Sequence, residues 1–206
     1  MFGQVQAAGL AWAAYDESMP APCDLNGGSG ADPRGDYAPK HNPAVYFLPL
    51  RGACHGRDLP LGTPSQGPLA RALRRPGGLA AFSFITPNLC DDTHDCPVAA
   101  GDAWLARWMP AILSSAPYRA GGTAIFITWD EGEGGSSDAC ATNTTDPGCH
   151  VATIVVSPST PRGTRSDLLF SHFSLLRTTE QLLGLGTFLG HAGDRGTRSM
   201  RRAFGL

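Results

Sequence analysis

Lysine is almost absent from this chain of 206 residues, in which Lys40 stands beside fifteen arginines. We interpret this as coding bias rather than as chemistry. Cationic residues are not in excess either, because the formal net charge is −2, which gives no reason to expect nucleic acid or an anionic membrane as a partner. No apolar stretch approaches eighteen residues, so the sequence predicts no integral membrane segment. Residues 1–14 contain no basic residue and do not resemble a secretory signal peptide.

Several motifs that identify enzyme classes are also missing. The chain contains no G-x-S-x-G elbow, no P-loop, no dinucleotide-binding fingerprint and no H-E-x-x-H helix. Their absence argues against serine hydrolases of the α/β type, P-loop and dinucleotide-binding enzymes, and zinc proteases of that class. No serine or threonine is marked out as a nucleophile.

Six cysteines are present, and they form three pairs in sequence order. An even number in loop-like surroundings favours disulfides and an oxidising compartment, so we expect a secreted or extracytoplasmic protein. A zinc site is the weaker alternative, because there is no Cys-x-x-Cys and the spacings do not recur. Local pairing is the simplest of the possible connectivities, and its pairs are Cys23 with Cys54, Cys90 with Cys96, and Cys140 with Cys149.

Continuous apolar segments alternate with segments of helical periodicity, which is typical of a parallel sheet covered by helices. We therefore predict an α/β protein with a single domain over residues 1–206 and a flexible tail at 195–206. Ligands of such sheets gather beyond the carboxyl ends of the strands. The predicted strands are 10–18, 79–85, 123–129 and 151–157, and the predicted helices are 2–9, 68–75, one from Asp102 and one from Ser171 to Gly184.

Two adjacent acids, Asp130 and Glu131, follow the predicted strand 123–129 directly. Just past the end of a strand both carboxylates can converge on one ion, and hard oxygen ligands suit a divalent metal that polarises a phosphoryl or carbonyl oxygen. The alternative is an acid pair that merely forms a turn, because glycines follow it.

A second acidic segment surrounds a histidine, with Asp92, His94 and Asp95 in a loop that Cys90 and Cys96 can close. Like charges this close together cost free energy unless a cation uses them. The alternative is a solvated acidic loop with an exposed His94.

Three further histidines are candidates of different strength. His41 lies in the segment KHNP, and His150 directly precedes the predicted strand 151–157. For His172, at a predicted helix start, we favour a structural role.

Together, six segments resemble the bacterial phosphoesterase family, which groups phospholipase C-type enzymes and acid phosphatases within the alkaline-phosphatase-like superfamily. The resemblance covers residues 2–185 in the family's order. The segments are KHNPAVYF, FSFITPNLCDDTHDC, GDAWLARWMPAIL, TAIFITWDEGEGG, HVATIVVSP and SHFSLLRTTEQLLGL.

This resemblance implies a three-layer α/β/α sandwich that binds a phosphate-ester substrate and a divalent metal ion. Asp130 and Glu131 match metal-binding acids of the family. His94, within the segment from Asp92 to Asp95, and His41 match groups that hold the phosphate oxygens, and His150 is a weaker match. The implied mechanism is in-line attack on phosphorus, with the metal and the histidines stabilising charge on the phosphoryl oxygens.

The family also carries an earlier segment, with an E-N metal-ligand motif and the nucleophile, that nothing in this chain matches. We therefore expect the C-terminal portion of a phosphoesterase, lacking the N-terminal strands. Its function is then that of a hydrolase of phosphoric ester bonds by metal-assisted phosphoryl transfer, with little or no turnover on its own. The alternatives are a non-catalytic remnant or phosphate- or metal-binding module, and a structural protein stapled by disulfides or zinc and without a site.

Overall fold

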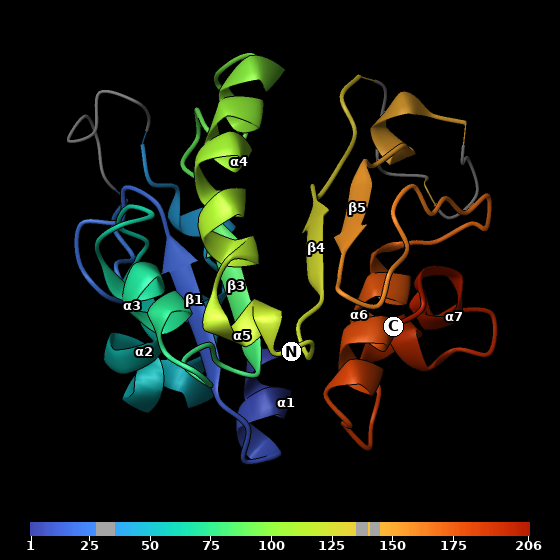
Figure 1. Cartoon of the computed structure of the whole chain (residues 1–206), viewed down its shortest axis with the longest axis horizontal. Helices are drawn as coiled ribbons and strands as arrows, with labels where there is room; N and C mark the ends of the chain where they lie inside the picture. Colours follow the sequence, from blue (N-terminus) through green and yellow to red (C-terminus); the bar gives the residue numbers. More distant parts are fainter. Residues whose placement is uncertain (28–35, 135–139, 141–144) are drawn as a thin grey trace. The chain divides into compact units, whose positions relative to one another are not determined.

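The computed structural model describes residues 1–27, 36–134, 140 and 145–206. The chain divides into two compact units, Met1–Ala120 and Gly121–Leu206, each of which is described here by itself (Figure 1). Each unit contains both helices and strands, so the predicted α/β class is confirmed. The three-layer arrangement and the single domain stay predictions. Among the described residues, no helix has both the length and the apolar character needed to cross a bilayer.

The first unit is built on a parallel sheet with the strand order β2-β1-β3. The central strand β1, Trp12–Asp16, is buried along its whole length, as its apolar sequence requires. It pairs with β2, Asp58–Pro60, and with β3, Phe82–Thr86, so that Ala14 lies opposite both Asp58 and Phe84. The sequence predicted β1 and β3, but β2 was missed because it is only three residues long.

Helices and tight turns surround this sheet (Figure 1). The longest helix, α4, keeps Trp104, Trp108 and Ile112 buried on one face, with the two indole rings 6.0 Å apart. It begins at Val98 rather than at the predicted Asp102, since Pro97 provides an extended residue before the first turn. The helices are α1 Phe2–Ala7, α2 Arg51–Arg57, α3 Pro68–Arg74, α4 Val98–Leu113 and α5 Ala116–Arg119, and the 3-10 turns are η1 Pro39–His41, η2 Pro43–Tyr46 and η3 Leu48–Leu50.

An aromatic cluster attaches α1 to the sheet. The ring of Phe2 lies 5.2 Å from both Trp12 and Phe82, with edge-on geometry in both pairs. Edge-to-face contacts of this kind add to the free energy that burial of the rings already supplies. The first turn of the chain is therefore part of the hydrophobic core of the first unit.

The second unit contains an antiparallel pair of strands, β4 Ile125–Thr128 and β5 Thr153–Val156, with Ile127 opposite Ile154. The predicted parallel arrangement is wrong for this pair. A parallel pair needs a crossover, usually a helix, whereas the described part of the connection holds only the 3-10 turn η5, Pro147–Cys149. The helices α6, His172–Leu182, and α7, Arg201–Phe204, follow together with η6, Gly190–Gly193.

The helix predicted from Ser171 is confirmed as α6. The Ser171 side chain accepts from the backbone of Ser174, and the Ser174 hydroxyl in turn accepts from the Ser171 backbone N–H, which is the reciprocal pattern of a capping box. All three predicted disulfides are also confirmed: Cys23–Cys54, Cys90–Cys96 and Cys140–Cys149.

Trp108→Ala should lower the free energy of unfolding by about 3–5 kcal/mol, because it empties a fully buried site on α4. Val98→Ala is the matched control on the same helix, since Val98 is 74% exposed. Urea denaturation measures both variants, and equal midpoints for the two would show that α4 does not anchor the core.

Candidate functional site

A cluster of histidines and aspartates in the first unit joins two predicted segments. The Nδ1 atom of His41 lies 3.2 Å from Asp92 Oδ2, and the two side chains are 25% and 16% exposed. The His94 ring lies 6.3 Å from that of His41, and His94 Nδ1 lies 2.7 Å from Asp95 Oδ1. The structure thus brings together four of the predicted residues, which we call the histidine cluster. Their roles stay predictions.

The His41 segment is held in place by the buried amide of Asn42. The amide nitrogen of Asn42 donates to both carboxylate oxygens of Asp58, at 2.9 and 3.0 Å, and the amide oxygen accepts from the Ala44 backbone N–H at 3.1 Å. The carbonyl of His41 also accepts a hydrogen bond from the hydroxyl of Thr86, at the end of β3, over 3.4 Å. Since β2 and β3 belong to one sheet, these contacts fix the backbone of His41 against it.

The His94 loop is held by a second buried amide, Asn88. Its side-chain oxygen accepts from the backbone N–H groups of Cys90, at 3.1 Å, and Asp91, at 2.9 Å. Asp91 turns away from the histidines and pairs with Arg107 of α4 at 2.7 Å. Asp91 therefore has a structural partner, while Asp92 and Asp95 remain beside the histidines.

Sequence reasoning missed the supports behind this cluster. The backbone N–H of Asn88 donates to Glu17 at 3.2 Å, and the Asn88 amide donates to the hydroxyl of Ser18 at 3.1 Å. Ser18 has a φ of 59°, in the left-handed region, directly after β1. The available signal was the pair of polar residues, Glu17 and Ser18, directly after an apolar strand. Asp130 and Glu131 follow an apolar strand in the same way.

Two carboxyl groups lie buried beneath the histidine cluster, Asp16 at the end of β1 and Asp58 at the start of β2. Burial, followed by the neighbouring Asp58, raises the pKa of Asp16 to about 8, and Thr86 opposes the shift. Burial also raises the pKa of Asp58, against the hydrogen bond from Asn42. Near neutral pH the pair therefore holds a proton that an exposed pair would have lost.

In the second unit, the backbone around Asp130 and Glu131 is held by two neighbouring segments. His172, the first residue of α6, donates from Nε2 to the Asp130 carbonyl at 2.6 Å. The N–H of Gly132 donates to the Gly148 carbonyl at 2.8 Å. A Cβ on Gly132 would lie 2.7 Å from the His150 carbonyl, so only glycine permits this approach. The backbone of His150 thus passes close to the acidic segment, and both carboxylate side chains are exposed.

The described residues do not complete a metal centre around these acids. Within that part of the chain, the only group of three potential ligand atoms lying within 4.8 Å of one another is Cys23, Cys54 and Asp58. The two sulfur atoms there form a disulfide, so this group does not bind a metal. Asp130 and Glu131 are suitable oxygen donors for a divalent ion, but they are not enough to coordinate it fully.

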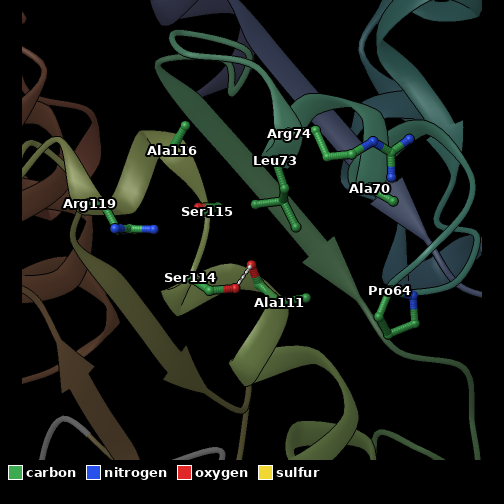
Figure 2. A pocket seen from close by; sticks show the side chains of 9 residues that line it. All are labelled: Pro64, Ala70, Leu73, Arg74, Ala111, Ser114, Ser115, Ala116 and Arg119. Carbon is green, nitrogen blue, oxygen red and sulfur yellow. Dashed lines mark hydrogen bonds between the residues drawn. The ribbon is translucent and has the colours of Figure 1, made fainter.

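A groove of about 570 Å³ lies in the first unit between α3 and the junction of α4 and α5 (Figure 2). It has an apolar floor, and Arg74 and Arg119 extend from its two sides. None of the predicted site residues lines it. Its lining is Pro64, Ala70, Leu73, Arg74, Ala111, Ser114, Ser115, Ala116 and Arg119.

Comparison with known proteins places the sequence in a family. The sequence profile described as "Phosphoesterase family" matches residues 1–186. The chain is 29% identical to a phosphatidylinositol-3-phosphatase of Mycobacterium tuberculosis over 182 residues, covering 88% of this chain and 52% of the relative. It is 26% identical to an acid phosphatase of Aspergillus fumigatus, covering 85% of this chain and 37% of the relative. The chain therefore spans about half, or less, of the length of these relatives.

Asp16→Asn should make the stability of the protein less dependent on pH. The folded state holds a proton on Asp16 up to about pH 8, whereas the unfolded chain releases it near the ordinary aspartate pKa of 3.8. The folded state binds more protons across that window, so wild-type stability should fall as the pH rises, by up to about 1.4 kcal/mol per pH unit. Asp58 is the neighbouring carboxyl group and its pKa is also raised, so the double variant with Asp58→Asn should remove the remaining slope.

Urea denaturation between pH 5 and 8, in roughly one-unit steps, measures this dependence. The exposed Asp102→Asn on α4 is the matched control and should keep the wild-type slope. A stability that rises over this window in the wild type would contradict the raised pKa of Asp16.

Proposed function

Because the chain belongs to the phosphoesterase family, we propose that it binds phosphate esters and takes part in their hydrolysis by metal-assisted phosphoryl transfer. The observation that carries the proposal is the histidine cluster. In it, His41 Nδ1 and Asp92 Oδ2 lie 3.2 Å apart, although fifty residues separate them in the sequence. The names of the relatives, phosphatidylinositol-3-phosphatase and acid phosphatase, support phosphomonoesters as the substrate class.

The two histidines would stabilise negative charge on the phosphoryl oxygens. Asp92 accepts from Nδ1 of His41, and Asp95 accepts from Nδ1 of His94, so that in both rings Nε2 is the nitrogen left for a ligand. An imidazole that carries a proton on both nitrogens donates from Nδ1 to its carboxylate partner and from Nε2 to a phosphate oxygen. The chain thus supplies oriented donors for the phosphate.

Asp130 and Glu131 would supply part of the coordination of a divalent ion, with His150 as a further candidate. When bound, such an ion polarises the phosphoryl oxygen and neutralises developing charge. The contact of His172 with the Asp130 carbonyl would restrict the backbone that presents both carboxylates. We assign orientation and charge stabilisation to these residues. We assign the attack on phosphorus to no described residue.

A second candidate function is a phosphate- or metal-binding module without turnover. The incomplete set of described ligands around Asp130 and Glu131 favours it. Both functions share the same binding chemistry and differ in whether a substrate is hydrolysed. For either one, the three disulfides support an oxidising, extracytoplasmic location.

The double variant Asp130→Asn/Glu131→Gln should weaken binding of Mn²⁺ by at least about tenfold, because an amide oxygen carries no charge for the ion. Glu133→Gln, in the same loop, is the matched control and should bind as the wild type does. Isothermal titration calorimetry measures all three proteins. Unchanged affinity in the double variant would remove these acids from the proposed metal site.

His41→Gln should weaken binding of inorganic phosphate by about tenfold near pH 6, because it deletes a charge-assisted donor. The control is His191→Gln, which removes a histidine from another exposed His–Asp pair, 2.9 Å from Asp194. Phosphorus NMR line broadening measures binding. Equal weakening in the two variants would show that any surface imidazole suffices, and would contradict a built phosphate site.

Turnover of a chromogenic phosphomonoester with added divalent metal ions separates the two candidate functions. We expect little or no hydrolysis by this chain, since no nucleophile is identifiable in it. Vigorous hydrolysis that His41→Gln abolishes would establish the hydrolase and overturn the module without turnover.

A further inference from the structure

Three consecutive large apolar side chains project from the surface of the first unit. Tyr46, Phe47 and Leu48, at the junction of η2 and η3, are 57%, 50% and 66% exposed. The next residue, Pro49, is exposed as well. We call residues 46–49 the apolar projection. Single exposed apolar residues are ordinary on protein surfaces, but a continuous run of this size marks an interaction site.

The apolar projection is held outward by its neighbours. Val45 and Leu50 on its two sides are 8% and 0% exposed, so both ends are anchored in the core. The N–H of Leu50, the residue that follows it, donates to the Phe47 carbonyl at 2.9 Å. Further along the chain, the disulfide of Cys54 fixes α2. Since the conformation is already ordered, a partner that covers these side chains has little backbone entropy to offset.

The charged side chains of the segment that carries the apolar projection have one sign. Residues 37–57 contain no aspartate or glutamate, although the whole chain has a net charge of −2. Lys40, Arg51 and His55 are exposed in this stretch, and Arg57 is partly occupied by a hydrogen bond of 3.0 Å to the Trp12 carbonyl. The negative total therefore conceals a local surface that combines cationic and apolar side chains.

We propose that the apolar projection inserts into the headgroup region of a bilayer that contains anionic lipids. Aromatic rings and leucine bury apolar surface there, the tyrosine hydroxyl stays in contact with water, and the flanking cations attract anionic headgroups. A second copy of the chain fits less well, because pairing the same surface across a two-fold axis brings like charges together.

This inference does not depend on the proposed function, because adhesion to lipid needs neither metal nor turnover. It does connect with it, since η2 begins directly after the His41 segment in the sequence. A lipid surface held at the apolar projection would bring phosphate groups toward the unit that carries the histidine cluster.

Co-sedimentation with vesicles tests the proposal on the full chain. The wild type should bind vesicles of phosphatidylcholine mixed with phosphatidylglycerol more strongly than vesicles of phosphatidylcholine alone. The triple variant Tyr46→Ser/Phe47→Ser/Leu48→Ser should lose at least about tenfold in its partition coefficient. The double variant Leu168→Ser/Leu169→Ser, at side chains 52% and 67% exposed, is the matched control and should keep wild-type binding.

A second variant tests insertion directly and does not rely on the fold of the triple variant. Phe47→Trp should show additional quenching by lipids brominated on their acyl chains, relative to the wild type with its four native tryptophans. Absence of wild-type binding to both kinds of vesicle, equal loss in the Leu168/Leu169 control, or no extra quenching of Phe47→Trp would each overturn the proposal. A dimer of the wild type that the triple variant dissociates, without vesicle binding, would assign the surface to self-association instead.

Discussion

The hydrogen bonds of Asn42 are the interaction on which the functional surface of the first unit depends. Its amide is fully buried and joins the carboxylate of Asp58, on β2, to the start of the turn that contains Ala44. Loss of one hydrogen-bond partner of a buried amide costs more free energy than the bond contributes to folding, because the remaining polar groups are left unpaired away from water. On one side of Asn42 lies His41 and on the other lies the segment that leads to the apolar projection. One side chain therefore sets the position of both features relative to the sheet.

The proposed chemistry is divided between the two units. The groups that we assign to the phosphate belong to the first unit, and the acids that we assign to a metal belong to the second. Each set is built locally: His41 against Asp92 in one case, and the acidic segment against His172 in the other. This local construction explains how either set can keep its geometry independently, and it is why a binding module without turnover is a distinct candidate.

The parts of the fold that were predictable are those with a local physical signature. Apolar runs revealed β1 and β3, a serine before a helical pattern revealed α6, and an even number of cysteines paired in sequence order revealed the disulfides. The antiparallel pairing of β4 and β5 had no such signature, because strand direction is set by the path of the connection rather than by the strand residues. The members of the histidine cluster were predictable as residue types, whereas the contact between His41 and Asp92 depends on the tertiary fold.

The supports beneath the site were the hardest to foresee, and the buried carboxyl pair shows why. Nothing in the local sequence separates Asp58 from an exposed aspartate, since its burial follows from the position of β2 beside β1. Once Asp58 is buried next to Asp16, the two carboxyl groups cannot both be charged at low cost, and the amide of Asn42 donates to Asp58 alone of the two. The proton that the pair holds near neutral pH therefore lowers the cost of keeping both carboxyl groups buried. The hydrogen bonds from Asn42 to Asp58 thus connect this buried pair to the segment that carries His41.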